Sequence, residues 1–136
     1  MRIFLDANIL FSAAKTDGAI RHLLSMLRKA GHECWVDSFA IEEARRNLLL
    51  KAADREADLD RVLRHIQTAK VQSGGSELLA GVELDEKDRP VLAAAIRLEC
   101  EALLTGDSTH FGHLYGQTIL GVTVHSPRSL AGELLT

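Results

Sequence analysis

Residues 2–11 of the chain read RIFLDANILF, an apolar run that is interrupted by one carboxylate, Asp6. We expect Arg2 to Ala7 to form a buried strand, because a short apolar run that ends at a charge is typical of one. The hydrophobic run continues beyond Asp6 through Ile9, Leu10 and Phe11, so apolar segments flank this carboxylate on both sides. Buried charges are normally paired or bound to a metal ion. Asp6 is therefore a candidate functional residue.

The remainder of the chain alternates predicted strands with predicted helices. Helices are expected at about residues 19–30, 39–50 and 56–71, from residues 87–89 to 100, and from 126–127 to 134, with strands at residues 34–36, 102–105 and 122–124. This alternation indicates an α/β fold, a layered sandwich of helices around a central, mainly parallel sheet. Residues 72–76 read as a loop that is too short for a domain linker, so residues 1–136 are predicted to form a single domain. The helices between residues 39 and 71 are expected to form an insertion at one edge.

Composition excludes several classes of protein. Hydrophobic residues make up 46 % of the chain and charged residues 26 %, which is ordinary for a globular domain. The net charge of −3 gives no overall attraction to nucleic acid, so such binding would need a local basic patch. The apolar start is too short for a signal peptide and no segment could span a bilayer, so we expect a cytoplasmic protein. Cys34 and Cys100 lack metal-ligand spacing and are predicted to be small buried residues.

Three further acidic residues are predicted to lie near Asp6. Asp107 follows the strand at residues 102–105, and Glu43 is placed near the start of the helix at residues 39–50. Pro90 fixes the next helix start near residues 87–89, because proline fits where its missing N–H would have no partner, and Asp88 then lies in the cap or first turn. In a parallel sheet, the carboxyl ends of strands and the amino ends of helices share one edge. Four carboxylates would therefore converge there.

Converging carboxylates repel one another unless a cation lies between them, and hard oxygen ligands suit Mg²⁺ or Mn²⁺. Each acid also has a structural alternative: Asp88 as a helix cap, Asp107 as a turn residue, and Glu43 as an exposed side chain beside Glu42. The conjunction of the acids at one edge is more specific than any single one. It favours a metal-dependent hydrolase in which the ion activates water for attack on a phosphodiester.

The acidic segments at residues 4–10, 38–48, 88–95 and 104–111 resemble, in order and spacing, the four blocks of the PIN domain family. The resemblance spans nearly the whole chain and is strongest to the ribonuclease toxins of the VapC type. It implies a three-layer PIN-like fold and a Mg²⁺- or Mn²⁺-dependent endoribonuclease. The same resemblance makes Asp6, Glu43, Asp88 and Asp107 the catalytic metal ligands, with Glu42 as an alternative to Glu43.

The resemblance also implies supporting residues around these carboxylates. Asn8 and Thr105 are expected to support the metal ligands through hydrogen bonds. Many family members carry a further acid just after the last aspartate, whereas Ser108, Thr109 and His110 occupy this stretch here. A hydroxyl there could orient water or phosphate, and the missing acid leaves the number of metal ions open, one or two.

RNA, a cognate antitoxin protein and a second copy of the chain are the partners that the resemblance implies. The predicted helices between residues 39 and 71 supply basic side chains that could meet RNA phosphates or an acidic antitoxin segment: Arg45, Arg46, Lys51, Arg55, Arg61 and Arg64. His110, in the loop beside Asp107, could also contact the RNA, although packing of the loop is the favoured explanation for this residue. Interspersed acidic residues leave open that this is only a solvated helix surface.

Rival readings are weaker. A phosphatase of the haloacid dehalogenase kind needs a second acid two residues after the first, where Asn8 stands. A receiver domain needs an acidic pair after its first strand, where Ala7 follows Asp6, and a lysine after a later strand, whereas residues 103–111 contain none. Within the PIN family, the alternatives to a toxin are a housekeeping RNA-processing nuclease and a catalytically weak module that binds RNA or protein.

Overall fold

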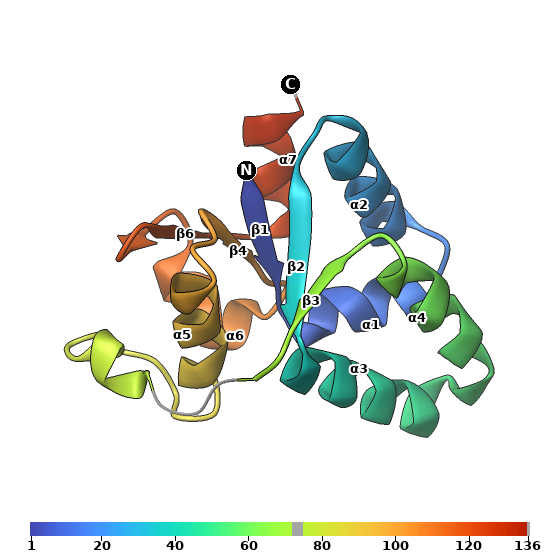
Figure 1. Ribbon diagram of the computed structural model, residues 1–136, viewed down its shortest axis with the longest axis horizontal. Coiled ribbons are helices and arrows are strands. Elements are labelled where there is room, and N and C mark those ends of the chain that lie inside the picture. Colours follow the sequence, from blue (N-terminus) through green and yellow to red (C-terminus); the bar gives the residue numbers. More distant parts are fainter. Residues whose placement is uncertain (72–74, 136) are drawn as a thin grey trace.

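A six-stranded sheet forms the centre of the computed structural model, which describes residues 1–71 and 75–135 (Figure 1). The strands run in the order β3-β2-β1-β4-β6-β5, and every neighbouring pair is parallel except β5 and β6. The strands are β1 Arg2–Leu5, β2 Glu33–Asp37, β3 Gln67–Ala69, β4 Ala102–Leu104, β5 Thr118–Ile119 and β6 Val122–His125. The predicted α/β fold with a mainly parallel sheet is thus confirmed.

Helices cover both faces of the sheet and complete a three-layer sandwich (Figure 1). The helices are α1 Ala7–Lys15, α2 Ala19–Lys29, α3 Ser38–Lys51, α4 Glu56–Leu63, α5 Arg89–Arg97, α6 Ser108–Phe111 and α7 Pro127–Leu134. Short 3-10 turns lie at Ala53–Arg55, Ser76–Leu79 and Gly112–Leu114. None of the helices in the described part of the chain is long and apolar enough to cross a membrane.

Alternating side chains of β1 divide the core into two layers. Ile3 and Leu5 pack on one face, with residues from α1, α2, α3, α4 and α7. Phe4 packs on the opposite face, with residues from α5 and α6. All three side chains are at most 1 % exposed, so β1 is buried on both faces, as its apolar sequence predicts. Because β1 also lies between β2 and β4 in the strand order, its carboxyl end, where Asp6 follows, lies in the interior of the sheet edge.

Several predicted boundaries are confirmed. The helices begin at Ala19, Ser38, Arg89 and Pro127, close to the predicted positions. Gly31 has a φ of 90°, the left-handed conformation expected of a residue that ends a helix. Cys34 and Cys100 are buried, and burial raises the thiol pKa of Cys34 to about 12 and that of Cys100 to about 11.

Two predicted elements were wrong. The helix expected to reach residue 71 ends at Leu63, and Gln67–Ala69 instead form β3, which pairs in parallel with β2. The predicted strand Arg2 to Ala7 stops at Leu5, because Asp6 caps a helix, α1, that we had not predicted. The loop predicted at residues 72–76 lies for the most part outside the described residues, and Ser76 begins a 3-10 turn.

Candidate metal centre

Asp6 is the most deeply buried acid of the centre, with 6 % of its surface exposed. Its Oδ1 accepts a hydrogen bond from the backbone N–H of Ala7 at 2.8 Å, which caps α1. Its Oδ2 accepts from Thr105 Oγ1 at 2.8 Å and from Asn8 Nδ2 at 3.1 Å. Both carboxylate oxygens are therefore held in place, which defines the direction in which the remaining lone pairs point.

Burial is the main reason why the pKa of Asp6 is raised above its usual range. The hydrogen bonds from Thr105 and Ala7 lower this pKa, and the negative charges of Glu43 and Asp88 raise it. Asp6 thus experiences the electrostatic repulsion that the sequence predicted among converging carboxylates.

Asn8 and Thr105 tie the end of β1 to the end of β4. The backbone N–H of Gly106 donates to Asn8 Oδ1 at 2.8 Å, and the N–H of Asp107 donates to Thr105 Oγ1 at 3.1 Å. Thr105 is fully buried, and Tyr115 donates its hydroxyl proton to the Thr105 carbonyl at 2.9 Å. The structure therefore brings both predicted supporting residues to Asp6, and Thr105 also to Asp107.

Asp88 and Asp107 meet at the ring of His110. Asp107 caps α6 by accepting from the backbone N–H of His110 at 3.1 Å, and its Oδ2 lies 3.1 Å from His110 Nδ1. Asp88 precedes α5 without making a capping hydrogen bond, and its Oδ2 lies 2.9 Å from the same nitrogen. Burial raises the pKa of Asp88, while the nearby His110 lowers it and Asp107 raises it. The two acids and the ring form one electrostatic group.

Glu43 lies deeper in its helix than predicted. Asp37 caps α3 by accepting from the N–H of Ala40 at 2.9 Å, so the helix begins at Ser38 and Glu43 lies in its second turn rather than at its start. Glu43 is half-buried whereas Glu42 is exposed, and it is Glu43 whose charge contributes to the raised pKa of Asp6. These observations favour Glu43 over Glu42 as the member from this segment.

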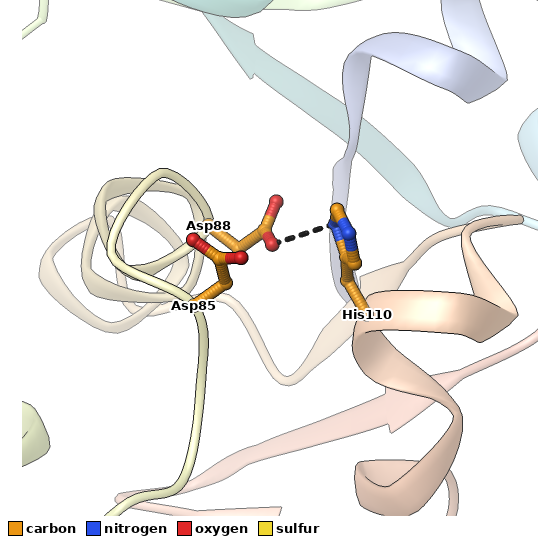
Figure 2. A group of neighbouring side chains, drawn as sticks. All are labelled: Asp85, Asp88 and His110. Carbon is orange, nitrogen blue, oxygen red and sulfur yellow. Dashed lines mark ion pairs between the residues drawn. The ribbon is translucent and has the colours of Figure 1, made fainter.

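Sequence reasoning missed one acid. One ligand atom each from Asp85, Asp88 and His110 lies within 4.8 Å of the other two, a spacing that a metal ion could use. Figure 2 shows Asp85 and Asp88 side by side at the turn that leads into α5, with the His110 ring facing Asp88. The N–H of Asp88 donates to the Asp85 carbonyl at 2.9 Å, which closes this turn. The Asp-x-x-Asp spacing before Pro90 was the available signal.

The other predicted site residues lie around this group with different roles. Ser108 and Thr109 are exposed at the beginning of α6. The Arg45 guanidinium pairs with Glu56 at 3.1 Å and with Asp60 at 2.9 Å, so it links α3 to α4. Arg46 is exposed and, within residues 1–71 and 75–135, makes no ion pair.

The donor set fits a divalent cation. Several carboxylates share one edge, burial raises the pKa of two of them, and Asp88 Oδ2 is shielded from solvent without a hydrogen-bond partner of proper geometry. A cation would offset this repulsion and satisfy that oxygen. The fold and these carboxylates define an α/β domain with an acidic centre at the carboxyl edge of its sheet.

A family model described as the PIN domain matches residues 2–109, and the chain belongs to this family. No curated protein matches the chain significantly. The fold is similar to that of VapBC2 from Rickettsia felis bound to a DNA fragment from its promoter, with 18 % identity, a TM-score of 0.70, and coverage of 93 % of this chain and 98 % of that one. Low identity limits the inference from these structures to the fold.

Two further solved structures share the fold. FitAcB from Neisseria gonorrhoeae has 17 % identity and a TM-score of 0.61, and the match covers 93 % of this chain and 98 % of that chain. VapC20 from Mycobacterium tuberculosis, a toxin that cleaves the sarcin-ricin loop, has 14 % identity, a TM-score of 0.53, and coverage of 79 % of this chain and 92 % of that one.

Proposed function

We propose that this chain is a Mg²⁺- or Mn²⁺-dependent endoribonuclease that acts in the cytoplasm as the toxin of a toxin–antitoxin pair. The observation that carries the proposal is the convergence of Asp6, Asp88 and Asp107, with Glu43, at the carboxyl edge of the sheet. The charges of Glu43 and Asp88 raise the pKa of Asp6, and the charge of Asp107 raises the pKa of Asp88, which supports this convergence. Membership in the PIN family supports the assignment to nucleases.

In this proposal, Asp6, Glu43, Asp88 and Asp107 hold the cation. A bound divalent ion lowers the pKa of coordinated water and offsets negative charge that develops on the phosphate. Asn8 and Thr105 fix the orientation of the Asp6 carboxylate through the hydrogen bonds described above. Precise orientation matters because a small displacement of a catalytic group lowers the rate substantially.

The substrate contacts are also part of the proposal. Ser108 and Thr109 are exposed next to Asp107 and would contact a phosphate or its attacking water. Arg46 would attract the RNA backbone, since its exposed guanidinium carries no ion pair among the described residues. Arg45 is assigned to the contact between α3 and α4.

The toxin assignment rests on the related structures. VapBC complexes from Rickettsia felis and Salmonella typhimurium and a toxin–antitoxin complex from Klebsiella pneumoniae share the fold with this chain. We propose by analogy that a cognate antitoxin binds this chain and that two copies form a homodimer. Growth arrest on expression, relieved by co-expression of a neighbouring antitoxin gene, would separate a toxin from an RNA-processing nuclease.

The test is cleavage of RNA by the purified protein with Mg²⁺ or Mn²⁺. Asp6→Asn and Asp107→Asn are each expected to lower the rate at least about 100-fold, because each removes a negative ligand from the cation. Asp54→Asn is the matched control, since Asp54 is exposed in the 3-10 turn between α3 and α4 and is not one of the acids of the centre. Thermal unfolding of each variant verifies folding, and full activity in both Asp6→Asn and Asp107→Asn would refute the proposal.

A further inference from the structure

The His110 ring lies between two carboxylates of the acidic centre, Asp88 and Asp107, at a place where a metal ion or another metal ligand is common. Its Nδ1 is shielded from solvent and has no hydrogen-bond partner of proper geometry, and the same is true of Asp88 Oδ2. These two atoms are nonetheless only 2.9 Å apart, and Asp107 Oδ2 lies 3.1 Å from the same nitrogen. Close polar atoms that do not point along a hydrogen bond need another explanation.

Coordination geometry supplies one. Octahedral sites with bonds of about 2.1 Å place neighbouring ligand atoms roughly 3.0 Å apart. The separations of His110 Nδ1 from Asp88 Oδ2 and from Asp107 Oδ2, 2.9 and 3.1 Å, match that spacing. Asp88 is 9 % exposed, and its Oδ2 faces the ring while Asp85 lies beside it (Figure 2). Asp88, Asp107 and the ring thus present donor atoms at the separation of adjacent metal ligands, and Asp85 offers a further oxygen within 4.8 Å of the donor atoms of Asp88 and His110.

Given the proposed metal-dependent activity, on which this inference rests, we propose that His110 Nδ1 is a direct metal ligand in a second cation position. Asp85 and Asp88 complete this position, and Asp88 is shared with the first position beside Asp6. A neutral imidazole with its proton on Nε2 leaves the Nδ1 lone pair free for the ion. Ser108 and Thr109 do not fill this role, because both are exposed on α6.

A nitrogen ligand changes which ion binds best. Carboxylate and water oxygens suit Mg²⁺ and Mn²⁺ alike, whereas imidazole favours transition-metal ions and contributes little to Mg²⁺ binding. The second position is therefore selective for Mn²⁺ over Mg²⁺. The first position, lined by carboxylates alone, accepts either ion.

The competing explanation is that His110 is a protonated imidazolium that neutralises Asp88 and Asp107. The two explanations predict opposite effects of removing the ring. A ligand that is lost weakens Mn²⁺ binding, whereas a competing positive charge that is lost strengthens it.

The experiment is titration of the full chain with Mn²⁺, followed by electron paramagnetic resonance of bound Mn²⁺ with pulsed detection of coupled ¹⁴N nuclei. Wild type is expected to bind two Mn²⁺ ions and to show coupling to one directly bound imidazole nitrogen. His110→Ala is expected to lose this coupling and to weaken the second Mn²⁺ at least about tenfold, with Mg²⁺ affinity nearly unchanged. Asp85→Asn should weaken the same ion and keep the first.

Control variants separate a loss of ligand from a loss of structure. His110→Gln keeps a polar side chain with an oxygen donor and should restore part of the affinity without the nitrogen signal. His22→Ala removes an exposed histidine on α2 and should change neither readout. Absence of ¹⁴N coupling in wild type, or unchanged or tighter Mn²⁺ binding by His110→Ala, would overturn the inference.

RNA cleavage distinguishes this failure from failure of the proposed function. If cleavage depends on Asp6 and Mg²⁺ but bound Mn²⁺ shows no nitrogen coupling, the nuclease assignment stands and the role of His110 is wrong. If neither divalent ion binds and RNA stays intact, both fail together.

Discussion

Asp88 carries a negative charge that the folded protein accommodates poorly without a cation. The pKa of Asp88 is raised by burial, so its folded value lies above its value in the unfolded chain. Between these two pKa values the folded state binds more protons than the unfolded state, and stability falls as pH rises through this interval. At neutral pH the full cost of the buried charge is present, and at a pH below both values it has disappeared.

Replacement of Asp88 by Asn is therefore expected to stabilise the metal-free protein at neutral pH. The thermal midpoint, measured in a chelator, should rise by a few degrees at pH 7.5, and the gain over wild type should vanish near pH 3.5. An amide next to His110 Nδ1 can donate a hydrogen bond to it, which adds to the effect. A gain that persists at acid pH, or a loss at neutral pH, would contradict this account.

Site residues could be predicted from the sequence where they lie directly after a strand or at the start of a helix. Asp6 and Asp107 follow buried strands, and Asp88 lies beside a proline that fixes a helix start, so sequence pattern placed all three. The contact between His110 and Asp88 joins α6 to the turn before α5, and no local pattern encodes such a tertiary contact. Asp85 differs in this respect, because it stands only three residues from Asp88 and the Asp-x-x-Asp spacing before Pro90 is a local signal that could have predicted it.

Among the elements, α3 and α4 are held together by ion pairs between side chains as well as by apolar contacts. The Arg45 side chain is 31 % exposed and contacts both Glu56 and Asp60, whereas its neighbour Arg46 is exposed on the same helix. Adjacent arginines in one helix thus have separate roles, one towards α4 and one towards solvent.

This contrast gives a paired prediction. Arg45→Ala is expected to lower the free energy of unfolding by about 1 kcal/mol, through loss of two ion pairs, and to leave RNA affinity nearly unchanged. Arg46→Ala should leave stability within about 0.5 kcal/mol and weaken RNA binding, with a smaller dependence on salt. Urea unfolding measures the stability of each variant, and RNA binding at several salt concentrations measures its affinity. If Arg45→Ala weakened RNA binding and Arg46→Ala lowered stability instead, Arg45 would be the residue that contacts RNA.

The wrong element predictions have physical causes. Leu59, Val62, Leu63 and Ile66 all pack on the core, so their helical spacing continues past the end of α4 at Leu63. The following strand, β3, has no apolar alternation of its own and forms because its backbone pairs with β2. Likewise the first turn of α1 contains the apolar residues Ile9 and Leu10, which the sequence alone does not distinguish from a continued strand.

At the scale of the whole molecule, a cation bound at the acidic centre would add its binding free energy to the stability of the folded chain. A ligand that binds the folded chain at a concentration 100 times its Kd contributes about 2.7 kcal/mol. We expect saturating Mn²⁺ to raise the thermal midpoint at pH 7.5 by about 10 °C. The rise should be nearly absent in a variant that carries both Asp6→Asn and Asp88→Asn, while an equal rise in that variant would place the stabilising ion elsewhere.

The hydrogen bond from Thr105 to Asp6 joins residues that are 99 positions apart. A ribosome makes Thr105 only 99 residues after Asp6, so the two halves of the centre are separated in time during synthesis. A chain that ends before residue 105 has Asp6 with Ala7 and Asn8 but without Thr105 and Asp107. Synthesis beyond residue 107 is therefore a precondition for an assembled centre, and a nascent fragment that is stalled or truncated before residue 105 cannot assemble it.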